Sequence, residues 1–224
     1  MTDATIVTTV PPDLIDVPKC LRDPSQRTAR LALLHWPLMD PLTARVDSTR
    51  AEADERDVPY FDPLDGGTVA ECLFLLEAPG PQARKSGFVS RNNPDETAKN
   101  WFELNVAAGI DRRRTILWNI VPWYIGSEGR IRPATTTDIQ RGLPYLLRLI
   151  ALLPALRVIV LVGKKASKAR FYLQSVDCRA TILEMPHPSP SFINRSKGNR
   201  DLLLHNLQRV RDTLDETDYL AAST

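Results

Sequence analysis

Three polar side chains of different chemistry stand where apolar runs end, in places that a ligand could reach. Glu77 closes the run LFLLE and is followed by Pro79 and Gly80, while Asn119 closes the run TILWN. His187 lies between two prolines in MPHPSPS. A carboxylate can orient water, an amide can both donate and accept a hydrogen bond, and an imidazole can donate to a developing anion. The set therefore has the groups needed for acid–base or hydrolytic chemistry.

The backbone and aromatic residues around these side chains narrow the kind of ligand. Proline fixes the backbone and glycine lets a ligand approach it closely. Phe88 and Trp123 offer flat apolar faces for stacking. A planar polar heterocycle joined to a sugar suits such a pocket, and an extruded nucleobase is one example. The residues alone leave other planar ligands open.

The elements that must position these residues alternate between strand and helix from residue 68 onward. The apolar runs predict buried strands, and the amphipathic segments between them predict helices. The strands are expected at 69–77, 115–121, 157–163 and 178–185, and the helices at 95–109, 135–153, 164–176 and 197–215. This alternation predicts a three-layer α/β/α fold with a central four-stranded parallel sheet. Loops at the carboxyl ends of such strands converge on the ligand site.

The first third of the chain has a different pattern. Residues 1–20 read as a loosely attached arm, and the pattern from Asp23 to about Arg56 is helical. We therefore expect an N-terminal arm and helical extension over 1–67, attached to an α/β/α domain over 68–224 as one structural unit. A chain of 224 residues with 43% hydrophobic residues can bury such a core.

Composition excludes several classes of site. Three widely spaced cysteines make a disulfide framework or a structural zinc site improbable, and they cannot supply four thiolates to an iron–sulfur cluster. No GxGxxG or GxxxxGK[ST] loop is present, which argues against an unrelated nucleotide-binding protein. No secretory signal is evident, and charged residues and Pro154 interrupt the most apolar stretch at 143–163. We expect a cytoplasmic monomer with no metal, no cofactor and no membrane span.

Several motifs in order resemble the uracil-DNA glycosylase superfamily. They are EAPG at 77–80 after a strand, Phe88 about ten residues on, Asn119 at the end of the next strand and HPSP at 187–190. The resemblance runs through about residues 70–205 and is nearest to the thermophile-type iron–sulfur branch. It implies an enzyme that hydrolyses the N-glycosidic bond of uracil in DNA and leaves an abasic site, as in base excision repair. Such a protein would associate with the nucleoid through its DNA partner.

The resemblance also implies roles for individual residues of the base pocket. Glu77 would position or polarise the attacking water, and His187 would hydrogen-bond O2 of the leaving base. Phe88 would stack on the flipped base, and Asn119 would read the O4/N3 edge of uracil. The substrate would also meet the backbone of Ala78, Pro79 and Gly80.

A second group of residues is expected to bind the DNA strand. The loop Ser189–Asn194 resembles the segment that clamps phosphates, and Phe192 is the candidate for a side chain that wedges into the base stack. A helix N-terminus near Lys164 could also favour phosphate. The predicted DNA-binding residues are Ser189, Ser191, Phe192, Asn194, Arg195 and Lys164.

The sequence departs from the family patterns at three points. Ala78 stands where the GQDPYH-type motif has its water-activating aspartate, and Gly80 replaces the tyrosine that excludes thymine. The four cluster cysteines are missing, so the N-terminal helices are expected to brace the loops instead. Because Ala78 cannot activate water, a second hypothesis is a non-catalytic or weakly catalytic binder of uracil-containing or abasic DNA.

Overall fold

A four-stranded parallel sheet forms the centre of the computed structural model, which describes residues 14–127, 130–175 and 179–222. The strand order is β4-β2-β5-β6. The strands are β2 (Cys72–Leu76), β4 (Thr115–Asn119), β5 (Val158–Val162) and β6 (Thr181–Met185). Each lies within the segment that the sequence predicted, so the expected fold class is confirmed.

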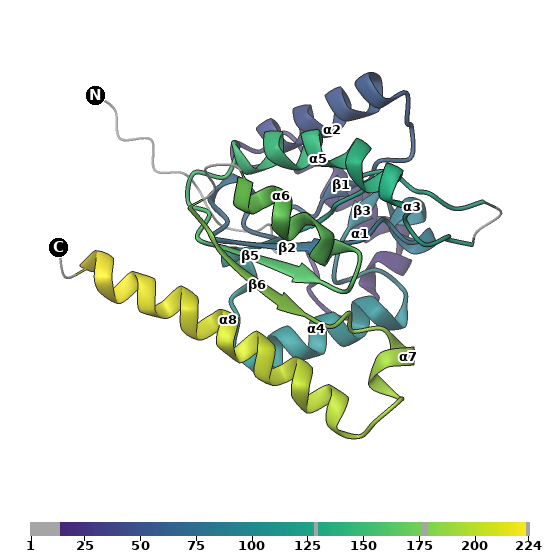
Figure 1. The fold of residues 1–224 in the computed structure, drawn as a ribbon. Helices are drawn as coiled ribbons and strands as arrows, with labels where there is room; N and C mark the ends of the chain where they lie inside the picture. Colours follow the sequence, from purple (N-terminus) through teal and green to yellow (C-terminus); the bar gives the residue numbers. More distant parts are fainter. Residues whose placement is uncertain (1–13, 128–129, 176–178, 223–224) are drawn as a thin grey trace.

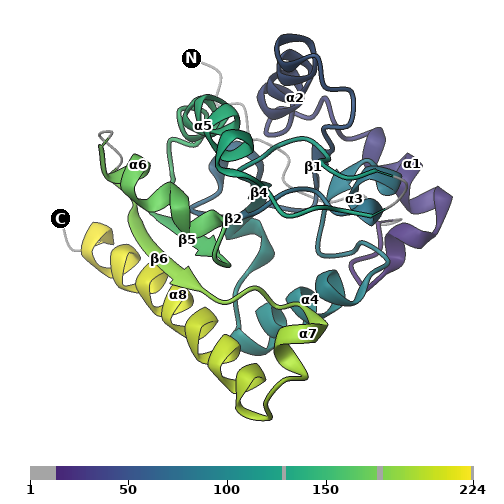
Figure 2. The same ribbon diagram turned by 45° about the vertical axis from the view of Figure 1, so that its right-hand side comes forward.

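Helices cover both faces of this sheet (Figure 1). On one face lie α4 (Glu96–Ala108) and α8 (Gly198–Ala222), which pack against each other. On the other face lie α5 (Thr136–Ile150) and α6 (Ala169–Ser175), as the turned view in Figure 2 also shows. No helix in the described part of the chain is long and apolar enough to cross a membrane.

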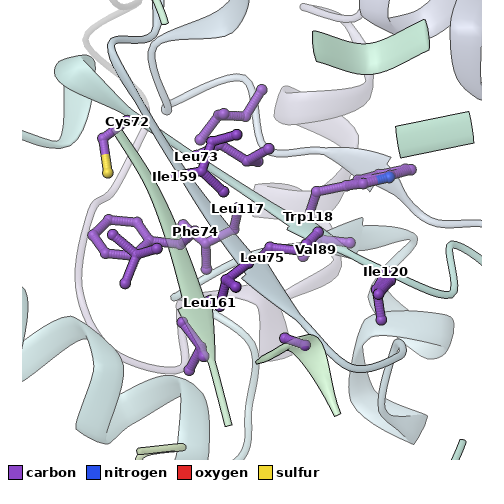
Figure 3. Close-up of a cluster of buried hydrophobic side chains, with 14 of the residues drawn as sticks. Cys72, Leu73, Phe74, Leu75, Val89, Leu117, Trp118, Ile120, Ile159 and Leu161 are labelled. Atoms are coloured by element: carbon purple, nitrogen blue, oxygen red, sulfur yellow. The ribbon is translucent and has the colours of Figure 1, made fainter. Parts of the chain in front are cut away.

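The core explains why the strands read as continuous apolar runs. Both faces of β2 are covered, so successive side chains such as Leu73 and Phe74 are all fully buried (Figure 3). Phe74 meets the ring of Trp101 from α4 edge-on, with centroids 4.8 Å apart. Cys72, at the start of β2, is fully buried among apolar side chains.

The N-terminal extension contains two helices rather than one continuous helical stretch. These are α1 (Pro24–Leu31) and α2 (Asp40–Ala53), separated by turns around Trp36 and Pro37. Short elements that the sequence did not predict occur in the connections. They are β1 (Tyr60–Phe61), which pairs in parallel with β3 (Phe88–Val89); the helices α3 (Pro81–Ser86) and α7 (Pro190–Ile193); and 3-10 turns at Cys20–Arg22, Gly67–Val69, Arg112–Arg114 and Ala166–Lys168.

A buried network of charged residues joins the extension to the sheet domain. Arg30 of α1 is fully buried and pairs with Asp62, which is also fully buried. Arg112, just before β4, pairs with Asp62 at 2.7 Å, with Asp65 at 2.6 Å and with Asp16 at 2.5 Å. Burial opposes ionisation of Asp62, yet the guanidinium groups of Arg112 and Arg30 hold its pKa below the ordinary value. We call these five residues the Arg–Asp network.

Candidate active site

A cavity of about 500 Å³ opens at the carboxyl ends of the strands. This volume falls in the usual range for small-molecule sites. Its walls include six of the residues predicted from the sequence, from the loops after β2, β4 and β6: Glu77, Ala78, Pro79, Gly80, Asn119 and His187. The fold thus brings together residues up to 110 positions apart, because the carboxyl ends of parallel strands share one edge.

Glu77 follows β2 directly and is held by the loop that precedes α5. Its Oε1 accepts a hydrogen bond from the Ala134 N–H at 2.6 Å, and its carbonyl accepts one from the Val121 N–H at 3.0 Å. Lys165 donates to the carbonyl of the same Ala134. The carboxylate is therefore fixed in direction at the cavity wall, where it could orient a water or face a cationic sugar.

Asn119 is the last residue of β4 and lies beside the end of β2, since Leu76 and Asn119 are register partners. It is only 3% exposed, and its Nδ2 has no hydrogen-bond partner among the described residues. A buried polar group left unpaired costs about 1–3 kcal/mol. An amide that lines a cavity and lacks a partner is available to recognise a polar edge of a ligand.

His187 lies in the loop after β6 and is held from two sides. Asn100 of α4 donates its Nδ2 to the Pro188 carbonyl at 3.1 Å. Gly163, at the end of β5, has a φ of +86°, and a Cβ added there would lie 3.1 Å from the Cβ of His187. Removal from water lowers the pKa of His187 below its ordinary value of 6.5. The ring is thus neutral at pH 7 and can donate one N–H into the cavity.

Several polar or aromatic residues of the wall were not predicted, among them Arg91, Asn93, Asp95 and Trp101. Asn93 donates to the Phe88 carbonyl at 2.9 Å, which leaves its buried Oδ1 unpaired, and the buried Nε1 of Trp101 is unpaired too. Asp95 caps α4 by accepting from the Ala98 N–H, and removal from water raises its pKa. The polar run RNNPD at 91–95 is the sequence feature that could have pointed to Arg91, Asn93 and Asp95 as residues of a turn or site.

Phe88 requires a correction, because the structure does not bring it to the cavity. Its side chain is fully buried against Leu21 and Leu34 of the N-terminal extension. Side chains alternate along a strand, so in the short β3 it is the neighbouring Val89 that lines the wall. Trp101 is an aromatic residue that does line the cavity, which Phe88 was expected to do.

The predicted DNA-binding residues lie beyond His187 and around α7. Ser189 caps α7 by accepting from the Phe192 N–H, and its hydroxyl lies 3.1 Å from that of Ser191. Asn194 and Arg195 are exposed, whereas Phe192 is half-buried and packs against the main core. Lys164 is exposed just after β5 and is not part of the cavity wall.

The N-terminal extension does contact the loop that follows β4. The Tyr124 N–H donates to the Asp57 carbonyl at 3.0 Å, and Asp57 also pairs with Arg84 of α3 at 2.8 Å. Trp123 is buried and meets Tyr145 edge-on, so it serves in packing rather than in the cavity. Asp57 of the extension thus contacts both this loop and α3.

The described residues contain no group of three or more histidine, cysteine or acidic side chains placed to hold a metal ion. Cys20 is half-buried in the N-terminal extension, and Cys72 is buried in the sheet. Cys178 lies outside the described residues. The polar groups that line the cavity include carboxylate, amide, imidazole and indole groups.

Comparison with known proteins agrees with this site. A family model described as the uracil DNA glycosylase superfamily matches residues 65–211, which include every strand of the sheet and every cavity residue discussed above. No curated protein matches the chain. The superfamily indicates hydrolysis of N-glycosidic bonds in DNA. On this match, and with a parallel sheet whose carboxyl edge carries Glu77, Asn119 and His187, the chain belongs to the uracil-DNA glycosylase superfamily.

Proposed function

We propose that this DNA glycosylase removes uracil, the product of cytosine deamination, and leaves an abasic site. The observation that carries the proposal is the convergence of Glu77, Asn119 and His187 on one cavity, with the Asn119 Nδ2 buried and unpaired. Uracil presents a carbonyl at O4 beside the N3 proton, and an amide can pair with both. The missing partner of Asn119 is then the O4 of a flipped base.

The leaving base needs a hydrogen-bond donor that acts on developing charge. When the bond between N1 and C1′ breaks, its electron pair stays on the base, and the negative charge spreads to O2. A neutral His187 donates a hydrogen bond to O2 and so stabilises that anion. The ring carries no positive charge before the bond breaks. A fixed donor of this kind typically contributes roughly 100- to 1000-fold in rate.

The sugar develops a positive charge, so it needs a negatively charged group nearby and a nucleophile that attacks C1′. Glu77 faces the oxocarbenium-like C1′ with a carboxylate and orients a water, whose oxygen forms the new bond to C1′. The water's proton passes to the carboxylate and then to solvent, while the base takes up a proton after it leaves. No lysine is among the described residues that line the cavity, which supports water rather than an amine as the nucleophile and a reaction without strand cleavage.

The decisive experiment uses oligonucleotides with one uracil, hypoxanthine, xanthine or thymine, single-stranded or in a duplex. Products are cleaved at abasic sites by alkali and resolved on gels. We expect cleavage at uracil, and the thymine substrate shows how far the enzyme tolerates a 5-methyl group. Cleavage at none of the four bases would overturn the enzyme proposal, and tight binding without product would favour the lesion-binding alternative.

The Asn119→Ala variant tests the reading of the base. Removing the amide should lower uracil excision while leaving DNA affinity, measured by gel shift, close to that of the wild type. The reason is that the amide meets the base and not the phosphate backbone. An Asn119→Ala enzyme with unchanged rate and base preference would exclude this role.

A further inference from the structure

A hairpin between β4 and α5 projects beside the cavity mouth. We define it by residues 124–127 and 130–133. Its two sides pair through Ser127 and Arg130, whose N–H groups donate to each other's carbonyls at 3.0 and 2.9 Å. In Figure 1 this segment extends away from the body of the molecule, past α3. Three residues of the hairpin, Ile131, Arg132 and Pro133, also line the cavity.

The side chain of Ile131 gives the hairpin an exposed apolar surface. It is 42% exposed, and among the large exposed apolar residues in the described part of the chain it alone lines the cavity. Its neighbours Arg130 and Arg132 are exposed as well. An apolar residue between two arginines at the mouth of a base pocket suits DNA, because the apolar side chain can contact stacked bases and arginines can contact phosphates.

The base of the hairpin is held rigidly. Arg132 makes a bidentate pair with Asp138 of α5, at 2.6 and 2.9 Å, and Asp138 is itself part of the α5 capping box. Two residues further on, the Ala134 N–H binds Glu77. On the other side, a Cβ at Gly126 would lie 2.2 Å from both the Tyr124 hydroxyl and the Arg130 carbonyl oxygen. Ile131 thus has a defined position relative to Glu77.

The HPSP loop is less suited to supply an inserted side chain. Phe192 is half-buried, packs against the core and carries a carbonyl tied to Asn199 at 2.6 Å. The two loops also leave opposite edges of the sheet, since the hairpin follows β4 and the HPSP loop follows β6. DNA over the cavity would therefore meet the hairpin on one side and α7 on the other.

We propose that Ile131 is a wedge that enters the base stack next to the flipped nucleotide, with Arg130 placed to meet a flanking phosphate. This inference rests on the proposed function, because a wedge has a purpose only if a base is extruded. Extrusion leaves a gap in the stack, and an inserted apolar side chain offsets part of the cost of unstacking. Single-stranded DNA has no paired stack to open, so it needs the wedge much less.

The first test compares Ile131→Ala with wild type on uracil in a duplex and in a single strand. We expect the single-turnover rate on the duplex to fall about tenfold and that on the single strand to fall less than about twofold. Ile131→Leu should restore the duplex rate. Val69→Ala is the matched control, since Val69 is similarly exposed (47%) but precedes β2, at the opposite end of the sheet.

Equal losses on both substrates, or no loss on the duplex, would overturn the wedge while leaving the glycosylase proposal intact. A rate on the duplex that falls in Phe192→Ala but not in Ile131→Ala would assign the wedge to α7 instead. Val69→Ala should match wild type throughout.

The second test does not depend on turnover. A duplex carries a tetrahydrofuran abasic-site analogue next to 2-aminopurine, whose fluorescence rises when it is unstacked. Wild type should raise the fluorescence, and Ile131→Ala should raise it by less than half as much at saturating protein. An equal signal from both proteins contradicts insertion of Ile131, even for a protein that proves to release no base.

Discussion

Glu77 combines two tasks in one side chain, because its Oε1 holds the Ala134 N–H while the charge faces the cavity. The two tasks can be separated by substitution. Glutamine keeps an acceptor oxygen for Ala134 but has no charge, whereas alanine loses both.

We expect Glu77→Gln to lower the rate of uracil release by roughly 100- to 10,000-fold, because general-base and charge effects are lost together. Its thermal unfolding midpoint should stay near that of wild type. Glu77→Ala should also lose about 1–3 kcal/mol of stability, because the buried Ala134 N–H is left unpaired. Single-turnover kinetics measures the expected loss of rate, and calorimetry measures the unfolding midpoints of the two variants. Wild-type turnover in Glu77→Gln would remove Glu77 from the mechanism.

His187 leads to a prediction about stability and pH. Removal from water lowers its pKa below 6.5 in the folded protein, so between pH 6.5 and that lower pKa the unfolded chain binds more protons than the folded one. The stabilising contribution of the neutral ring is present above pH 6.5 and is lost as the pH falls through the folded-state pKa. His187→Gln should therefore lose less stability than wild type on acidification below pH 6.5, as measured by urea unfolding. The matched control is the same substitution at an exposed histidine of α8, His205→Gln.

At the scale of elements, the site depends on how closely α5 approaches the loop after β4. Gly142 lies on the buried face of α5, and a Cβ added there would stand 1.9 Å from the Ile120 carbonyl oxygen. Ile120 directly follows Asn119, so the helix packs against the backbone next to Asn119. A side chain at this point must push helix and strand apart.

Gly142→Ala should therefore destabilise the protein by about 1–3 kcal/mol or more, although alanine favours helix over glycine. It should also weaken uracil excision, through displacement of Asn119. Gly198→Ala is the control: a Cβ there meets nothing within 4 Å at the start of α8, and its stability should match or exceed that of wild type. Calorimetry and excision rates of the two variants distinguish a steric clash between α5 and Ile120 from a general effect of replacing glycine by alanine in a helix. A Gly142→Ala protein as stable as wild type would show that the helix can shift freely.

At the scale of the whole molecule, the Arg–Asp network links residues of the N-terminal extension to Arg112, just before β4. Arg30, Asp62, Asp65 and Arg112 are buried, so their charges depend on one another for compensation, whereas Asp16 is partly exposed. The network also reaches the cavity wall, since Asp16 pairs with Arg91 at 2.9 Å as well as with Arg112. Loss of one member of the network should therefore lower the stability of the protein and also disturb the cavity wall at Arg91.

Asp62→Ala should cost about 3–5 kcal/mol, because Arg30 and Arg112 would be left as buried charges with fewer partners. Glu52→Ala, which breaks a half-exposed pair with Arg148, should cost less than about 1 kcal/mol. Urea unfolding followed by circular dichroism measures both. Similar small losses in the two variants would mean that the extension folds independently of the sheet.

The local pattern of the sequence determined the sheet, its helices and the positions of Glu77, Asn119 and His187. Continuous apolar runs identify strands covered on both faces, and parallel strands bring their carboxyl ends to one edge whatever the loops contain. For that reason residues at the ends of separate runs could be placed around one cavity before any contact was known.

Only the tertiary structure decided which side chains near those ends face the cavity. Phe88 and Val89 differ by one position, and the choice between them follows from the pairing of β3 with β1, some 28 residues earlier in the chain. Trp101 lines the cavity wall because of the position of α4, and Ile131 lines it because of the position of the hairpin. The Arg–Asp network joins residues from 16 to 112. Such contacts depend on packing between distant segments, which the periodicity of a single segment does not record.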